Sequence, residues 1–248
     1  MSVHHQSSPW ILASHQGDIS FITLNRVDEG NRVTNQMALD LCLALDASNQ
    51  SRVIVLNANG SEFCLGRDMP PPKPGSGTTA QDVLKNDTEP VLKLFDAFNR
   101  CVQPVVCAVQ GKAWGIGMVL AAVADVTLAS TNSTFRLREL ERGIPPCIAM
   151  APLLDRMPVK ALAHLVFSTQ EMNAATALTT GVVSQLVNQD AAGQLLTQEV
   201  AALTQMMLSF PDASIQAVKH YLKTAPRYHE TNAAHYGASL LANVLSSR

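Results

Sequence analysis

The first part of the chain alternates between strand-like and helix-like patterns of hydrophobic residues. Residues 17–24 alternate apolar and polar side chains, which is typical of a strand with one buried face. Residues 53–56 form a short continuous apolar run, the pattern of a strand buried on both faces. Between them, residues 37–47 place apolar side chains mostly at helical spacing. Together the three segments predict a parallel strand–helix–strand crossover.

The alternation of strand-like and helix-like segments recurs along the chain and is followed by a part with a different composition. Helix-like and strand-like segments alternate over residues 83–99, 104–109, 118–124 and 126–129, and a last strand-like segment covers residues 182–187. From residue 152 onward Ala-, Leu- and Gln-rich segments predominate, so this part is expected to be mainly helical. We predict an α/β core over residues 1–190 and a helical region over residues 191–248. Residues 70–77 are rich in Pro and Gly and predict a mobile surface loop.

Composition and charge narrow the classes of partner. The chain has 248 residues, 47% of them hydrophobic and 15% charged, with a formal net charge of -2. This balance offers no surplus of cations for nucleic acid or an anionic membrane, and no apolar run reaches the roughly 18 residues of a membrane span. We therefore expect a soluble, cytoplasmic protein. The 5 cysteines form no CxxC pair and the 7 histidines show no ligand spacing, so neither disulfides nor a bound metal is expected.

Two glycine-bearing segments stand out because each follows a predicted buried strand. They are residues 63–68, FCLGRD, and residues 111–117, GKAWGIG. Glycine permits a sharp turn, and a helix that begins after such a turn presents unpaired N–H donors. Ordinary tight turns are the simplest alternative. A dinucleotide fingerprint in the second segment would need a third glycine where Leu120 stands, and neither a phosphate-loop nor a GxSxG motif occurs.

The order and spacing of several motifs resemble the enoyl-CoA hydratase/isomerase (crotonase) family. The matching segments are residues 24–26 with Asn31, 63–68, 104–111 running into 115–117, 124–125, 135–139 with 143–145, and 174–183. The resemblance spans roughly residues 17–190. It implies a ClpP/crotonase spiral of ββα units that binds an acyl-CoA or acyl-pantetheine thioester. It also implies that the helical region covers the CoA and helps to form homotrimers or hexamers.

By this resemblance, two main-chain amides hold the thioester carbonyl oxygen in an oxyanion hole. The donors implied are the N–H groups of Arg67 and Ile116. Such a hole stabilises an enolate, but a base or acid must still move the proton. Family hydratases use two glutamates, whose positions correspond here to Val119 and Glu139. Further residues implied at the substrate are Gly66, Asp68, Gly115, Gly117 and, toward the CoA phosphates, Arg32.

Because only Glu139 is retained, the resemblance favours double-bond isomerisation with Glu139 as the proton shuttle. Hydration with a water positioned otherwise, decarboxylation, thioester hydrolysis and non-catalytic thioester binding remain alternatives. Glu139 also has charged neighbours, so a solvated ionic cluster is possible, and Glu141 is a second candidate base. Lys219 and Lys223 are weak candidates for phosphate contacts. No cofactor is expected, since coenzyme A is part of the substrate. A serine peptidase of the ClpP type would need an exposed serine near the second glycine turn, and the helix expected over residues 118–124 contains none.

Overall fold

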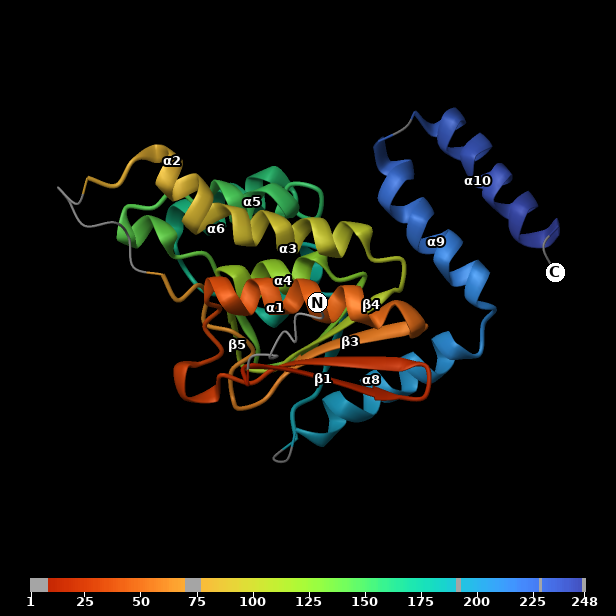
Figure 1. The fold of residues 1–248 in the computed structure, drawn as a ribbon, viewed down its shortest axis with the longest axis horizontal. Helices are drawn as coiled ribbons and strands as arrows, with labels where there is room; N and C mark the ends of the chain where they lie inside the picture. The colour runs from red at the N-terminus through yellow and green to blue at the C-terminus, as the bar shows by residue number, and fades with distance from the viewer. Residues whose placement is uncertain (1–8, 70–76, 191–192, 228, 247–248) are drawn as a thin grey trace, which may run out of the picture.

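The computed structural model describes residues 9–69, 77–190, 193–227 and 229–246, and its centre is a six-stranded sheet (Figure 1). The strand order is β1-β2-β3-β4-β6-β9, with β1 antiparallel to β2 and every later pair parallel. β3 and β4 are apolar and buried along most of their length, as a central parallel strand requires. The strands are β1 (Ile11–Gln16), β2 (Ile19–Leu24), β3 (Val53–Ala58), β4 (Val105–Val109), β6 (Val126–Ser130) and β9 (Gln185–Val187).

A second, smaller sheet runs beside the first and receives one short segment from each successive turn of the chain. It contains β5 (Lys112–Trp114), β7 (Thr134–Arg136) and β8 (Met172–Asn173), in the order β5-β7-β8. Two isolated bridges extend this row, Cys64 to Ala113 and Val33 to Arg67. The chain therefore places a long strand in the large sheet, a short one in the small sheet and then a helix. This repeating order is the ββα spiral that the family resemblance implies.

Helices cover both faces of the large sheet (Figure 1). α1, α3 and α4 lie on one face, and α8 packs on the other through Leu196 and Val200. No helix among the described residues is long and apolar enough to cross a membrane. The α-helices are α1 (Asn35–Ala47), α2 (Ala80–Asp82), α3 (Glu89–Arg100), α4 (Ile116–Val123), α5 (Cys147–Leu153), α6 (Val159–Ser168), α7 (Ala174–Thr179), α8 (Gln194–Leu208), α9 (Asp212–Thr224) and α10 (Glu230–Ser246). Shorter turns are η1 (Val27–Glu29), η2 (Ser48–Gln50), the π-helical η3 (Val83–Thr88), η4 (Glu139–Arg142) and η5 (Ala225–Arg227).

The segments predicted from hydrophobic pattern are present, with differences at a few places. The prediction of a strand over residues 182–187 is wrong for its first half, since only Gln185–Val187 forms one. β1 was not predicted because the side chains after Ile11 are exposed and show no alternation. The hydrophobic pattern does not predict β5 or β7, because each has only three residues. The expected loop at residues 70–77 lies, except for Gly77, outside the described residues.

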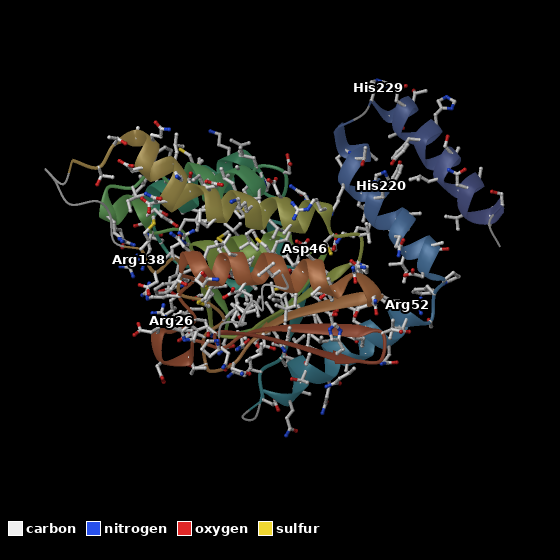
Figure 2. The ribbon with its side chains drawn as sticks, viewed as in Figure 1. Arg26, Asp46, Arg52, Arg138, His220 and His229 are labelled. Atoms are coloured by element: carbon white, nitrogen blue, oxygen red, sulfur yellow. The ribbon has the colours of Figure 1, made fainter. Side chains whose placement is uncertain are left out.

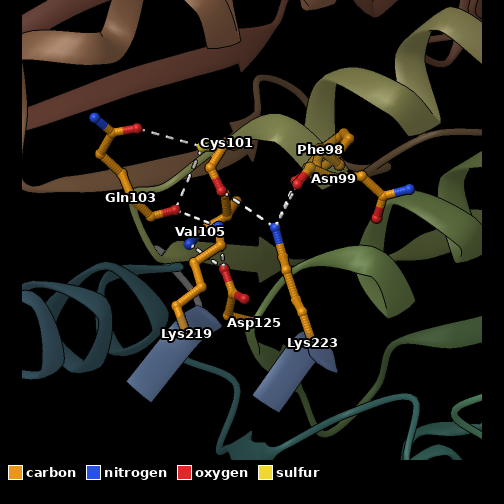
Figure 3. Close-up of polar contacts among 8 residues, drawn as sticks. All are labelled: Phe98, Asn99, Cys101, Gln103, Val105, Asp125, Lys219 and Lys223. Carbon is orange, nitrogen blue, oxygen red and sulfur yellow. Dashed lines mark hydrogen bonds and ion pairs between the residues drawn. The ribbon is translucent and has the colours of Figure 1, made fainter. Parts of the chain in front are cut away.

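The end of the chain forms a helical arm of α9 and α10 that projects to one side of the α/β body (Figure 1). α10 has no buried side chain among its described residues. α9 is anchored by Lys219, which is 5% exposed, pairs with Asp125 at 2.9 Å and also donates to the carbonyl of Gln103 (Figure 3). The ammonium of Lys223 donates to three carbonyls at the end of α3, those of Phe98, Asn99 and Cys101. The boundary expected near residue 190 falls between β9 and α8, but α8 still packs on the sheet.

Candidate active site

The two glycine turns singled out in the sequence lie against each other. Cys64 donates to the carbonyl of Lys112 at 3.0 Å and accepts from the amide of Trp114 at 2.8 Å, so the chain before each turn is paired. Both Gly66 and Gly115 have positive φ, at 105° and 52°. A Cβ on Gly115 would lie 3.3 Å from the Cα of Gly66. The missing Cβ of Gly115 permits this close approach, whereas Gly66 is favoured by its φ, since a Cβ there would meet only the carbonyl of Trp114 at 3.6 Å.

The amides that follow these glycines have no acceptor in the described part of the chain. Val33 pairs with the carbonyl of Gly66 at 2.9 Å and with the amide of Asp68 at 3.0 Å, which leaves the amide of Arg67 outside the ladder. Ile116 is the first residue of α4, where an amide has no intrahelical acceptor. No described residue accepts a hydrogen bond from either N–H group. Two neighbouring backbone donors are thus available to a ligand.

Glu139, which belongs to the next turn of the spiral, lies beside the second glycine turn. It follows β7 and begins the short η4 turn, which is closed by the Ile144 amide donating to the Glu139 carbonyl at 3.0 Å. Its Oε1 lies 3.1 Å from the position that a Cβ on Gly115 would occupy. Its Oε2 is buried and has no hydrogen-bond partner among the described residues. Burial raises the pKa of this carboxyl group above its ordinary value, against the smaller opposing effects of nearby amides and of Arg142 and Arg138.

A cavity of about 860 Å³ joins these groups. Its size is within the range of small-molecule sites. Of the residues predicted from the sequence, it is lined by Arg32, Gly66, Arg67, Asp68, Gly115, Ile116, Val119 and Glu139. Gly117 was also predicted at the substrate, but it does not line the cavity. A Cβ on Gly117 would lie 2.5 Å from the carbonyl oxygen of Cys64, so this glycine allows α4 to pack against the first turn.

One wall of the cavity is apolar. Val119 is fully buried on α4, one helical turn after Ile116, and offers only methyl groups. Further apolar lining comes from Val91 and Phe95 on α3, from Ile148 and Ala149 on α5, and from Ile144 in the segment before α5. This surface suits a hydrocarbon chain rather than a water held by charge.

The alternative base Glu141 belongs to an ionic cluster instead. Its carboxylate contacts Arg136 at 2.5 Å and Arg138 at 3.1 Å, and it does not line the cavity. The charged surroundings noted in the sequence therefore engage Glu141, while Glu139 forms no ion pair among the described residues. Asp68 lines the cavity, but its carboxylate is 2.6 Å from Arg26 and is neutralised there. Figure 2 shows Arg26 and Arg138 at the end of the molecule away from the arm.

The basic residues proposed for phosphate contacts separate into two groups. Arg32 lines the cavity and donates to the carbonyl of Leu65 at 3.1 Å, which leaves further guanidinium donors for a ligand. Lys219 and Lys223 lie elsewhere, with their ammonium groups engaged in anchoring α9.

The cavity offers no side chain for nucleophilic catalysis of the peptidase kind. No serine, histidine or cysteine is among its described lining residues. Cys64 lies close by, but burial raises the pKa of its thiol to about 12, so it stays protonated. Cys147 is exposed at the start of α5 and does not line the cavity.

Several lining groups were missed from the sequence. The sequence points only to the amide of Arg67, whereas in the fold its guanidinium also has unused hydrogen-bond donors. Arg138 and Arg142 were treated as part of a solvated cluster, and Asp87 was not considered. The π-helical turn η3, which carries Asp87, looks like an ordinary helix in the hydrophobic pattern. No local signal in the sequence marks it.

Comparisons with known proteins agree with this geometry. Residues 14–247 match the family model described as enoyl-CoA hydratase/isomerase. The chain is similar to a protein of Escherichia coli K12 named 2,3-dehydroadipyl-CoA hydratase, with 31% identity over 86% of this chain and 81% of that protein.

Solved structures show the same fold. An enoyl-CoA hydratase from Mycobacterium smegmatis superposes with a TM-score of 0.86 at 21% identity, over 96% of this chain and 91% of that one. A protein of Thermobifida fusca solved in complex with CoA, described as a putative enoyl-CoA hydratase, gives 0.83 at 22% identity, over 96% and 93%. With the family match over most of its length, this chain belongs to the enoyl-CoA hydratase/isomerase family.

Proposed function

We propose that this protein binds an acyl-CoA thioester and moves a carbon–carbon double bond along its acyl chain. The observation that carries the proposal is the pairing of one buried carboxylate, Glu139, with two available amides, while Val119 stands at the position of a second glutamate. Isomerisation needs a single group that removes a proton from one carbon and returns it to another. Two-glutamate hydration needs a second group that valine cannot supply.

The substrate of this reaction is a 3-enoyl thioester. The carboxylate of Glu139 takes a proton from C2, and the electron pair delocalises over C2–C4 and the thioester oxygen as a dienolate. The amides of Arg67 and Ile116 stabilise the negative oxygen; in other enzymes one such donor contributes about 3–4 kcal/mol. The protonated Glu139 then returns the proton to C4, and the double bond becomes C2–C3. The raised pKa of Glu139 suits this role, because the group must both accept and release a proton.

Binding of the coenzyme is supported by the charge at the cavity. Arg32 retains guanidinium donors that can contact a phosphate. The fold neighbour from Thermobifida fusca was solved with CoA, which supports a CoA carrier over other thioester carriers.

Hydration is the second candidate, because the relative from Escherichia coli is named a hydratase. Asp87 lines the cavity and would be the group to orient a water in the absence of a second glutamate. In this reaction, water adds across C2–C3 of a 2-enoyl thioester and Glu139 delivers the proton to C2.

Ultraviolet absorbance of the conjugated enoyl thioester separates the two reactions. The purified protein is mixed with 3-hexenoyl-CoA in one assay and with 2-hexenoyl-CoA in another. Isomerisation predicts a rise in absorbance in the first assay and no lasting fall in the second. A fall in the second assay, with 3-hydroxyhexanoyl-CoA as product, would replace the isomerase by the hydratase. No reaction in either assay, despite binding, would favour a non-catalytic thioester-binding protein.

We also propose that the helical arm packs against further copies of the chain. Its exposed apolar side chains include Val218, Leu222, Leu241 and Leu245, between 54% and 61% exposed. Such a surface supports an interface between subunits, consistent with the homotrimer or hexamer that the resemblance implies. Light scattering on the full chain is expected to give three or six times the mass of 26.6 kDa. A monomer at micromolar concentration would contradict this.

A further inference from the structure

Arg67 lines the cavity, and its side chain keeps unused hydrogen-bond donors. Its Nη2 donates to the side chain of Asn35 and, at 3.4 Å, to the carbonyl of Asp87. Its Nε and Nη1 are buried and have no hydrogen-bond partner in the described part of the chain. A guanidinium cannot escape the cost of burial by losing its proton. Donors left in this state are stabilised when a ligand supplies an acceptor.

The charge of Arg67 is also left without a contacting anion. Burial lowers the pKa of its guanidinium, and the charge of Asp87 only partly offsets this. No carboxylate of the described residues lies within ion-pair distance of Arg67. The contact to Asp87 is made through its backbone carbonyl, not its carboxylate.

The rest of the lining does not supply the missing negative charge. Three further arginines face the same cavity, Arg32, Arg138 and Arg142. Of the lining carboxylates, Asp68 is already paired with Arg26. Arg138 is in turn paired with Glu141 at 3.1 Å, so Glu139 and Asp87 remain against the guanidinium groups of Arg32, Arg67 and Arg142. The cavity as a whole therefore favours a ligand that carries negative charge beyond what the protein provides.

From these contacts we infer that the acyl group of the substrate carries a second carboxylate, which is bound by the unused nitrogens of Arg67. This inference rests on the proposed function and specifies its substrate class as an acyl thioester of a dicarboxylic acid. A carboxylate is the acceptor that a guanidinium binds most strongly in proteins, whereas a purely hydrocarbon chain leaves Nε and Nη1 unsatisfied.

The position of Arg67 also limits where the second carboxylate lies. The amide of this residue is one of the two donors proposed for the thioester oxygen, and its guanidinium is at the end of the same side chain. The carboxylate is therefore separated from the thioester by only a few carbon atoms. Glutaryl and adipyl chains have a second carboxylate at such a separation from the thioester.

Binding of saturated thioesters tests the inference without depending on turnover. Dissociation constants are measured by calorimetry for glutaryl-CoA against pentanoyl-CoA and for adipyl-CoA against hexanoyl-CoA, pairs of equal carbon number. The full-length protein is expected to bind at least one dicarboxylic thioester about tenfold or more tightly than its partner. Arg67→Met is expected to bring this preference to about one, and Arg67→Lys, which keeps the charge but not the planar group, to an intermediate value.

A matched control removes one positive charge elsewhere. Arg100 lies on α3 outside the cavity, is exposed and pairs with Asp46 at 3.5 Å. Arg100→Met is expected to keep the full preference. The inference is overturned if neither dicarboxylic thioester is preferred, or if the preference survives in Arg67→Met with a native circular dichroism spectrum. Failure of all four thioesters to bind would instead overturn the proposed function itself.

Discussion

Oε1 of Glu139 lies 3.1 Å from the point where a side chain on Gly115 would begin. The carboxylate thus occupies space that only a glycine at the second turn leaves open. The same missing Cβ lets this turn approach the Cα of Gly66. One residue without a side chain therefore brings together the proposed base and both proposed oxyanion donors.

Gly115→Ala is expected to disrupt this arrangement. A Cβ would press on the carboxylate of Glu139 and on the first turn, and the φ of 52° with ψ of -122° is strained for alanine. We expect kcat/KM to fall about a hundredfold and the free energy of unfolding to fall by about 1–3 kcal/mol. The control is Gly17→Ala, where φ is also positive but no atom lies within 4 Å of the new Cβ. That variant is expected to keep full activity; equal losses in both variants would refute the steric explanation.

The rate of isomerisation should depend on pH through Glu139. The base acts only when ionised, and burial raises the pKa of this carboxyl group above the ordinary 4.5. As the pH falls, kcat/KM is therefore expected to decline at a higher pH than an exposed glutamate would give. The profile is recorded between about pH 4 and 8, with circular dichroism at each point to verify folding. A rate that stays constant down to pH 4.5 would contradict an elevated pKa.

Glu139→Gln should stabilise the protein at neutral pH. Below pH 4.5 the carboxyl group is protonated in both folded and unfolded chains, so its ionisation costs nothing. As the pH rises through 4.5 toward the folded-state pKa, only the unfolded chain releases the proton, and the folded state loses stability. Glutamine avoids this loss. A higher Tm for the variant at pH 7, and a smaller difference near pH 4, are expected in thermal unfolding; a lower Tm at pH 7 would show that the charge is well solvated.

The anchor of the arm depends on an ion pair in which one partner is buried. Lys219 is 5% exposed, whereas the side chain of Asp125 is 21% exposed. Lys219→Met leaves the carboxylate of Asp125 with only the Val105 amide, which donates to it at 2.7 Å. We expect a loss of about 1.5–3 kcal/mol in the free energy of unfolding by urea. The double variant with Asp125→Asn should recover part of it, because the charge is then removed. Lys93→Met, at an exposed pair with Glu89, should cost about 1 kcal/mol or less. Similar losses at the two lysines would refute the claim that burial of Lys219 makes its ion pair the stronger one.

Hydrophobic pattern was sufficient for the large sheet and the longer helices, but not for the small sheet. β3 and β4 are continuous apolar runs, which mark central strands in any context. β5 and β7 have three residues each, too few to show a period, and they exist only because successive turns of the spiral pair with each other. The sequence marks these segments in other ways: β5 lies in the second glycine segment, and β7 lies in one of the motifs of the family resemblance.

The glycine turns of the candidate site could be predicted from the sequence. The roles of its charged side chains could not, because two glutamates compete for the same arginines. Gly66 and Gly115 are marked by their residue type. The choice between Glu139 and Glu141 was open in the sequence, because both stand among arginines. The choice is decided by Arg136 and Arg138, which pair with Glu141, whereas Glu139 lines the cavity. These contacts are local, three and five residues along the chain, but the spacing alone does not say which of the two carboxylates the arginines engage.

The position of the Arg67 side chain could not be predicted from the sequence either. At the sequence level its amide was the relevant group, since any residue can donate from the backbone. The direction of its guanidinium depends on Asn35 and on the π-helical turn that presents the carbonyl of Asp87. Both lie far from Arg67 in the sequence, so the unused donors became visible only in the fold.

The central claim is that Glu139 alone moves the proton in this site. Its most direct test compares Glu139→Gln with Glu141→Gln in the isomerisation of 3-hexenoyl-CoA, with the dissociation constant of hexanoyl-CoA measured for each. We expect Glu139→Gln to lower kcat by about 10²–10⁴ while thioester affinity stays within about threefold, and Glu141→Gln to behave like the unmodified protein. Retained turnover in Glu139→Gln, or a loss confined to Glu141→Gln, would contradict the claim.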